Sequence, residues 1–274
     1  MQPTQKSKAE LFRNLHFSGK LLILPNIWDA LGARILEKSG YPSVATASVS
    51  TALTNGYTDG ERIPYKKLLE VVKRISDAIS IPLTVDIERG YAKTIFQLKE
   101  NIRLLISHGG VGINIEDSLP DRKGFYSTTE QCSKIEAVKE MGIACGVPIV
   151  INARTDIFRH KTEINAMQQA VERAKAYRKA GADCIYPILI DNYEEISRFV
   201  QEVEMPVNVY LLEPISDMQL LEKIGVTRVS TGPQLLKHAL TYMKLLVDDL
   251  KNYSSISFYN RELMASEYLN DLVE

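Results

Sequence analysis

This 274-residue sequence has few cysteines, a single tryptophan and no excess of charge of either sign. The three cysteines, Cys132, Cys145 and Cys184, make neither an even disulfide framework nor a CxxC metal pair, so a reducing cytoplasm fits best. The formal net charge is -1, which provides no bulk positive field to hold a polyanion. We therefore expect a cytoplasmic protein that does not bind nucleic acid.

Long apolar runs and nucleotide-binding motifs are absent as well. No run approaches the ~20 apolar residues of a membrane span, and the polar N-terminus lacks the apolar core of a signal peptide. Neither GxGxxG nor GxxxxGK(S/T) follows an apolar run. The sequence therefore predicts a soluble protein that has no membrane partner and lacks the usual nucleotide-binding signals. The four histidines form no ligand-like pair; they are His16, His108, His160 and His238.

Short β-branched runs alternate with helix-periodic segments along the whole chain. Strands are predicted over 21–26, 43–48, 83–88, 111–117, 149–156, 184–188, 207–211 and 228–231, each followed by a helical pattern. A polar loop is expected after the second strand. Parallel neighbours need crossover connections, so this order predicts a parallel sheet covered by helices. Eight units without a break in composition predict an α/β protein with a (β/α)8 TIM barrel, and an open doubly wound sheet is the alternative.

Two further segments flank the predicted barrel, which with its lead-in helix near 7–17 covers 1–251. Residues 252–274 are predicted to form a C-terminal helical arm. This arm either packs on its own barrel or is exchanged with a neighbouring subunit, since a complete barrel needs no further cover. Its apolar residues stand at helix-like spacing; they are Phe258, Leu263, Met264, Tyr268 and Leu269.

Carboxylates stand where predicted strands end. Asp86 and Glu88 end one strand, Glu116 lies at the end of the next, and Asp59 follows the second strand. The carboxyl ends of barrel strands share one mouth, so these like charges would be close unless they take up protons or surround a cation. Oxygen ligands without His or Cys favour Mg2+, or else Mn2+, over zinc. The sequence therefore predicts a divalent metal site.

Polar groups that could hold a substrate stand at other strand ends. Arg154 is suited to bind a carboxylate or phosphonate in bidentate fashion, and a salt bridge to Asp156 or Glu116 is the alternative. Ser48 and the amides around it could bind a substrate oxygen. The segment 228–233, RVSTGP, opens the last helix, where many barrels bind phosphate on helix amides, or it forms a plain turn.

Seven segments, in order, resemble the isocitrate lyase and phosphoenolpyruvate mutase superfamily. They are LPNIWDALGAR (24–34), VATAS (44–48), GYTDGE (56–61), VDIERGY (85–91), GINIED (112–117), INARTD (151–156) and AGADCI (180–185). The resemblance implies an α/β barrel and a homotetramer, a dimer of dimers that exchanges C-terminal helices.

The resemblance also implies roles for individual residues. Asp86 would bind Mg2+ directly, with Asp59, Glu88 and Glu116 acting largely through water. We expect catalytic roles for Arg154, Glu116 and Asp59. The substrate would be held by Arg154 and Ser48, in a pocket lined by Trp28 and Asn208.

The loop after the fourth strand departs from the superfamily patterns. The lyases carry a KKCGH-type motif whose Cys is an acid or base, and mutases and phosphonate hydrolases carry a Lys followed closely by Asn. Here the loop reads EDSLPDRKGFYST (116–128) and has neither. The missing loop group could be supplied by Arg122, Lys123, Tyr126 or Ser127, closing over the substrate. The alternative is that these residues only form a solvated, charged loop.

Superfamily members make or break bonds beside an enolate of a small 2-oxo or 2-hydroxy acid. We therefore expect a Mg2+-dependent lyase that cleaves a carbon-carbon bond in such a carboxylate, with the metal neutralising the enolate. A loop without Cys is compatible with protonation by solvent or with decarboxylation of an oxaloacetate-like acid. Two alternatives remain: phosphonopyruvate-type phosphonomutase or carboxyvinyl-carboxyphosphonate phosphorylmutase chemistry, and a non-catalytic protein that binds 2-oxo acids.

Overall fold

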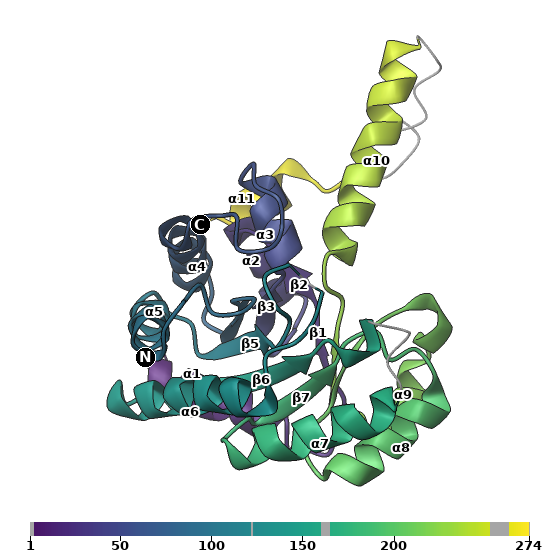
Figure 1. The fold of residues 1–274 in the computed structure, drawn as a ribbon. Coiled ribbons are helices and arrows are strands. Elements are labelled where there is room, and N and C mark those ends of the chain that lie inside the picture. The colour runs from purple at the N-terminus through teal and green to yellow at the C-terminus, as the bar shows by residue number, and fades with distance from the viewer. Residues whose placement is uncertain (1–2, 122, 160–164, 253–262, 274) are drawn as a thin grey trace.

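A computed structural model describes residues 3–121, 123–159, 165–252 and 263–273 (Figure 1). All its strand pairs are parallel, and they run β2-β3-β4-β5-β6-β7 in one sheet and β1-β9-β8 in the other. The strands are β1 (Leu22–Leu24), β2 (Asn26–Ile27), β3 (Val44–Thr46), β4 (Leu83–Asp86), β5 (Gly112–Glu116), β6 (Val150–Thr155), β7 (Cys184–Pro187), β8 (Asn208–Tyr210) and β9 (Arg228–Ser230).

The two sheets join at both edges into one ring. β1 and β2 are a single run of chain that Pro25, which has no N–H to donate, divides between the sheets. At the other edge, an isolated parallel bridge between Ile185 and Val207 connects β7 to β8. The ring therefore has eight strand positions, and the predicted (β/α)8 barrel is confirmed.

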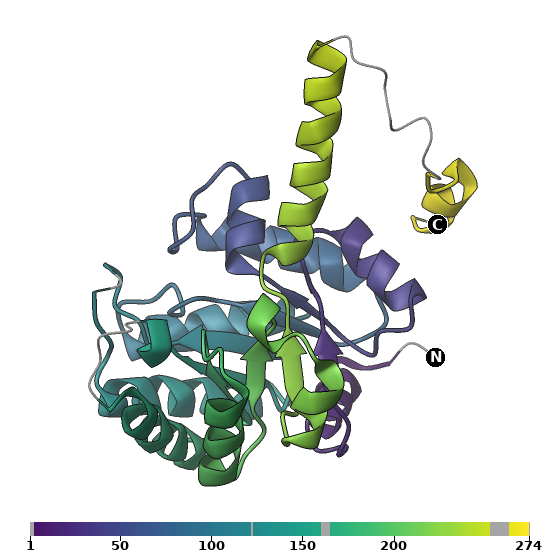
Figure 2. The ribbon, with the colours of Figure 1, turned by 90° about the vertical axis from the view of Figure 1, so that its right-hand side faces the viewer.

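Helices cover the outside of the ring, as Figures 1 and 2 show. Several begin at a side-chain cap, for example Asp29 for α2 and Thr94 for α5. The expected loop after the second strand is wrong in part, because residues 48–54 form a helix. The helices are α1 (Gln5–Leu15), α2 (Ala30–Lys38), α3 (Ser48–Thr54), α4 (Tyr65–Ala78), α5 (Ile95–Ser107), α6 (Thr128–Ala144), α7 (Ala166–Lys179), α8 (Tyr193–Val203), α9 (Met218–Lys223), α10 (Gln234–Lys251) and α11 (Ser266–Asp271).

Helix α1 closes the floor of the barrel. Phe12 on this helix is fully buried. A Cβ built on Gly112, at the start of β5, would lie 2.7 Å from Cε1 of Phe12 and 2.9 Å from Oγ1 of Thr84. The approach of the aromatic ring therefore depends on glycine at this position.

Helix α10 projects away from the barrel in both views (Figures 1 and 2). Leu236 is its only buried residue. The projection thus begins before residue 252, where the helical arm was predicted to start. Apolar side chains along the helix are exposed; they are Leu235, Leu240, Met243, Leu245, Val247 and Leu250.

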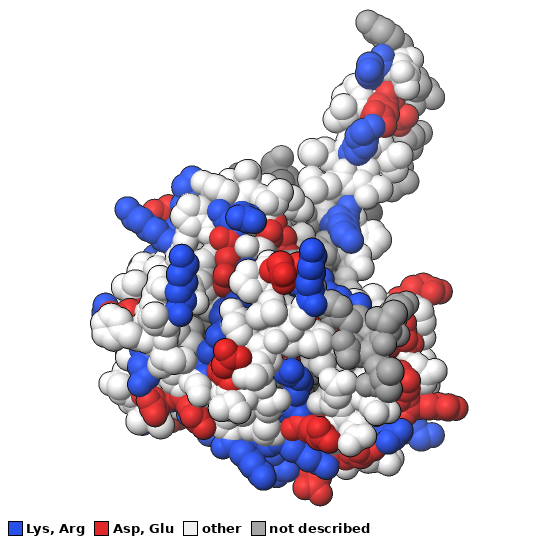
Figure 3. All heavy atoms as spheres, viewed as in Figure 1, with Lys and Arg blue, Asp and Glu red and all other residues white. Residues whose placement is uncertain are grey.

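Helix α11 packs on the barrel of its own chain. Leu272, which follows it, is fully buried, and Nζ of Lys38 donates to the carbonyl of Asp271 at 2.6 Å. Phe258, named with the predicted arm, lies outside the described residues. In the described part of the chain, no helix is both long and apolar enough to span a membrane. Charges of both signs are interspersed on the face in Figure 3.

Candidate active site

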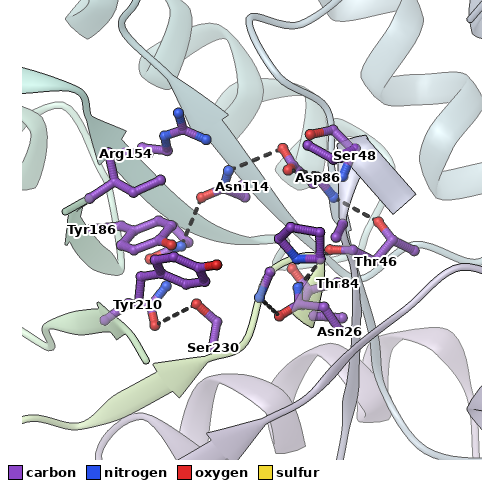
Figure 4. Close-up of a pocket in the computed structure, with 18 of the residues that line it drawn as sticks. Asn26, Thr46, Ser48, Thr84, Asp86, Asn114, Arg154, Tyr186, Tyr210 and Ser230 are labelled. Atoms are coloured by element: carbon purple, nitrogen blue, oxygen red, sulfur yellow. Dashed lines mark hydrogen bonds between the residues drawn. The ribbon is translucent and has the colours of Figure 1, made fainter. Parts of the chain in front are cut away.

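A cavity of about 230 Å3 opens among the carboxyl ends of the strands and extends into the barrel (Figure 4). Its polar walls follow the two-residue period of a strand, because every second residue faces the barrel axis. The intervening residues, such as Val85, Ile113 and Val229, are buried under the helices. Most barrels fill this space with aliphatic side chains, so a polar interior indicates a binding site. The strand residues lining it include Asn26, Thr46, Thr84, Asp86, Asn114, Asn152, Arg154, Tyr186, Asn208, Tyr210, Arg228 and Ser230.

Asp86 and Asp59 form the acidic wall of this cavity, whose lining does not include Glu88 or Glu116. Oδ1 of Asp86 accepts from Nδ2 of Asn114 and from the backbone N–H of Glu88, both at 3.1 Å. Its Oδ2 accepts from the backbone N–H of Ser48 at 3.2 Å (Figure 4). These donors fix the carboxylate in place.

Glu88 is almost fully buried beside Asp86 and has a left-handed backbone, with φ of 50°. Its Oε1 accepts from the backbone N–H of Glu61 at 2.6 Å and from the hydroxyl of Tyr91 at 3.3 Å. Burial, together with the negative charges of Asp59 and Asp86, raises the pKa of Glu88 to about 8. This carboxyl group therefore exchanges a proton near neutral pH.

Arg89 connects the carboxylates of three segments. It is 3% exposed, and its guanidinium contacts Glu61 at 3.2 Å, Glu116 at 3.3 Å and Glu88 at 3.9 Å. The positive charge of Arg89 thus offsets part of the repulsion expected among these carboxylates. The sequence reasoning did not select Arg89, since the left-handed residue before it breaks the strand pattern.

Arg154 lies across the cavity from Asp86 (Figure 4). Its Nε and Nη2 donate to the two carboxylate oxygens of Asp156 at 2.5 and 2.8 Å, and its Nη1 lies 3.0 Å from Oε2 of Glu116. The salt-bridge alternative is therefore realised. A guanidinium has five N–H groups, so two remain for a substrate. The carboxylates of Glu116 and Asp156 outweigh burial and raise the pKa of Arg154.

Three other predicted residues also line the cavity: Ser48, Asp59 and Asn208. The backbone N–H of Ser48 already binds Asp86, so its hydroxyl is the group that remains for a ligand. Asn208 is fully buried, and its Oδ1 accepts from Oγ of Ser230 at 3.2 Å.

Trp28 is not in this cavity. It lines a separate groove with Leu31, Asn55 and Val273. The prediction that Trp28 lines the substrate pocket is therefore not supported. The residue directly follows β2, and the chain turns outward into α2 there.

Within the segment 228–233, the residues that follow β9 form a plain turn. The backbone N–H groups of Thr231 and Gly232 donate to Oδ1 of Asn26 at 2.9 and 2.8 Å. Because these two amides already have an acceptor, the phosphate-binding alternative is not supported for them.

The loop after β5 folds back on itself outside the cavity. A bridge pairs Ser118 with Phe125, and the N–H of Tyr126 donates to the carbonyl of Asp117 at 2.8 Å. Of the four candidate loop groups, Tyr126 lies under Nζ of Lys134 and Ser127 caps α6. Lys123 does not line the cavity either, and Arg122 lies outside the described residues.

Sequence reasoning also missed several residues that line the cavity, among them Asn114, Tyr186 and Arg159. Asn114 and Tyr186 follow from the two-residue period, because they alternate with buried Ile113 and Ile185. Arg159 comes from the turn after β6 and lies 3.0 Å from Asp156.

The donor set fits a hard cation held largely through water. Among the described residues, no three His, Cys, Asp or Glu side chains converge closely enough to hold an ion directly. A fixed Asp86 oxygen pair facing a polar cavity, with further carboxylates close by, nevertheless matches the preference of Mg2+ for one or two carboxylates plus waters.

Comparison with known proteins agrees with this fold. The family model described as phosphoenolpyruvate phosphomutase matches residues 12–251. A crystal structure of a candidate phosphonomutase from Burkholderia cenocepacia J2315 is 33% identical, covers 90% of this chain and 99% of its own, and has a TM-score of 0.86. The 2-methylisocitrate lyase of Halalkalibacterium halodurans is 26% identical over 77% of this chain and 69% of its own.

A phosphonopyruvate hydrolase solved with oxalate and Mg2+ shares the fold, with 20% identity, a TM-score of 0.84, and coverage of 97% of this chain and 94% of its own. The resemblance carried by the seven sequence segments is thereby confirmed. Since the family model spans almost the whole barrel, this chain belongs to the phosphoenolpyruvate phosphomutase family.

Proposed function

We propose that the protein is a Mg2+-dependent lyase that cleaves a carbon-carbon bond in a small 2-oxo or 2-hydroxy carboxylate through an enolate. The observation that carries the proposal is that Asp86 and Arg154 line one cavity. A metal-oriented oxo acid could thus lie between an acidic wall and a guanidinium with two N–H groups to spare. The relatives named 2-methylisocitrate lyase and phosphonopyruvate hydrolase, the latter solved with oxalate and Mg2+, support this class of chemistry.

The residues of the site would have separate roles in binding the metal and the substrate. Asp86, oriented by Ser48 and Asn114, would bind Mg2+, and Glu88, Glu116 and Asp59 would hold its waters. A bound Mg2+ would supply the positive charge that stabilises an enolate. Arg154 would hold the substrate carboxylate, and Asp156 keeps its guanidinium plane fixed.

Protonation of the enolate would fall to solvent. In its described part, the loop after β5 places neither Lys123, Tyr126 nor Ser127 in the cavity. This arrangement favours reactions that need no acid from the loop, such as decarboxylation of an oxaloacetate-like acid.

Turnover of a panel of acids, with and without Mg2+, tests the proposal. The panel contains oxaloacetate, 2-hydroxy tricarboxylates of the 2-methylisocitrate kind, and phosphonopyruvate. We expect Asp86→Asn to lower kcat/KM at least 100-fold, since removing a metal ligand removes the Lewis acid. Asp77→Asn, on the exposed face of α4, is the matched control. Equal turnover by the Asp86 variant would refute the metal role.

A phosphonomutase is the second candidate, because the 33% identical structure carries that name. Turnover of phosphonopyruvate without turnover of any carboxylate would favour it. Mg2+-dependent binding of oxalate without turnover of any panel member would instead favour a non-catalytic binding protein.

We also propose that the protein is a homo-oligomer, a dimer of dimers, in which α10 packs on a second copy. Four apolar side chains of this helix are about half exposed: Met243, Leu245, Val247 and Leu250. Met243, Val247 and Leu250 lie three and four residues apart and so share one face of the helix, and an exposed apolar stripe of this kind is typical of an interface.

A further inference from the structure

The floor of the cavity carries a buried charge that the proposed reaction does not use. Arg228 begins β9, pairs in register with Leu22 and Asn208, and is 2% exposed. Like Ser230 two residues later, it lines the cavity. The Arg228 side chain thus enters the same space as Asp86, from the opposite end of the strands.

The guanidinium of Arg228 forms no salt bridge in the described part of the chain. Its Nε and Nη1 are buried without a hydrogen bond. A guanidinium stays protonated even when buried. An isolated buried charge costs several kcal/mol, so such groups are normally paired.

The side chains around Arg228 do not supply the missing negative charge. The ring of Phe12 lies 5.9 Å from its Cζ. Burial lowers the pKa of His16 to about 3 and raises the pKa of the Cys184 thiol to about 12, so both are neutral at pH 7. Asp86 acts on Arg228 only at longer range.

Neighbouring groups on the floor add further donors. Nδ2 of Asn208, whose residue pairs with Arg228 across the β8-β9 ladder, is buried without a partner, and so is the hydroxyl of Thr84. Thr84 borders Phe12 through Gly112. The floor thus gathers N–H and O–H donors around one positive charge, which is the donor set of an anion site.

We propose that Arg228 and Asn208 form an anion-binding subsite at the floor of the cavity, which holds a small monovalent anion or one carboxylate of a bound acid. The volume of about 230 Å3 is several times the ~30 Å3 share of a water molecule, so an ion of a few heavy atoms fits. The subsite does not depend on the proposed lyase reaction, because anion binding is measured without turnover.

Thermal unfolding in different sodium salts tests the subsite. Wild-type protein, Arg228→Met and Arg103→Met are compared in chloride, formate and the bulky disulfonate PIPES at equal ionic strength, with PIPES as the anion too large to enter. We expect chloride or formate to raise the Tm of the wild type by about 2–4 °C over PIPES, with no rise in Arg228→Met. Arg103, exposed on α5, should behave like the wild type when replaced.

A second arm identifies the source of the anion. With Mg2+ present, calorimetry compares malate with 2-hydroxybutyrate, which lacks the second carboxylate. An affinity at least tenfold higher for malate, lost in Arg228→Met, assigns the subsite to the far carboxylate of a substrate. An effect of chloride or formate alone assigns it to a free anion.

The proposal is overturned if neither arm shows an effect that depends on Arg228. Should Arg228→Met fail to fold, Arg228→Lys keeps the charge, and we expect it to keep at least part of the stabilisation. A wild-type protein that responds equally to all three salts and binds both acids equally would then contradict the subsite.

Discussion

Asp156 holds Arg154 through both of its carboxylate oxygens, at 2.5 and 2.8 Å, within one strand end. This bidentate pair fixes the plane of the guanidinium, and Glu116 fixes its other edge at 3.0 Å. The pair with Asp156 therefore sets the direction of the two remaining N–H groups of Arg154. The orientation of a bound carboxylate thus depends on Asp156, which need not touch the carboxylate.

Replacing Asp156 by Asn should impair turnover more than it impairs properties that do not involve substrate, such as the stability of the fold. The amide keeps the shape but loses one acceptor of a charged hydrogen bond, worth about 1.5–3 kcal/mol. We expect kcat/KM to fall about 10- to 150-fold, mainly through KM. Steady-state kinetics with the best acid of the panel measures this fall. Asp217→Asn, a cap of the distant α9, is the control, and an equal loss in both variants would contradict a positioning role for Asp156.

The buried Glu88 should make the metal-free protein less stable as pH rises. Its pKa is about 8 in the folded chain against a usual value of 4.5, so the folded state binds the extra proton between these values. This contribution to stability is complete below pH 4.5 and is lost as pH rises through 8. Thermal unfolding in EDTA should show the decline, and Glu88→Gln should flatten it. A pH profile of Glu88→Gln that equals the wild-type profile would rule out this source.

Gly112→Ala should destabilise the barrel floor. The new Cβ would lie 2.7 Å from Phe12 and 2.9 Å from Thr84, and overpacking of this kind costs about 1–3 kcal/mol. Chemical denaturation measures the loss, and Phe12→Leu in the same chain should recover part of it. Gly124→Ala meets only one ordinary contact at 3.4 Å, so it should change stability little. Comparable losses at both glycines would contradict the role of the ring.

Charges placed on α10 should dissociate the proposed oligomer. Met243→Glu with Leu250→Glu puts two carboxylates on the exposed apolar side chains of the helix, where burial against a second copy would desolvate them. Light scattering coupled to gel filtration should show a smaller particle than the wild type. The control is Lys244→Glu with Lys251→Glu, on the same helix. A wild-type protein that elutes as a monomer would refute the interface.

The sequence predicts the strands and the position of Asp86 at a strand end well because both follow from short-range patterns. Asp86 and Glu116 end β-branched runs, and parallel strands must bring such ends together. Helix α3 escaped prediction since Ser48 to Thr54 are mostly Ser and Thr, which are weak helix formers. The position of Arg89 and the outward position of Trp28 are harder to predict, because both depend on how the chain turns after a strand. A residue with a left-handed backbone, such as Glu88, gives no periodic signal in the sequence.

Because of a contact made by Asn26, completion of the pocket depends on the order in which the chain is synthesised. The Asn26 side chain accepts from an amide 205 residues later, at Thr231, and this contact joins the first strand to the turn after the last. Contacts of such sequence separation form slowly, because a long loop must be closed before they contribute. On the ribosome, where the N-terminal units emerge first, the candidate site can be completed only after the turn at Gly232 has left the exit tunnel. A nascent chain that stops short of β9 would carry Asp86 and Arg154 on an open sheet without their common cavity.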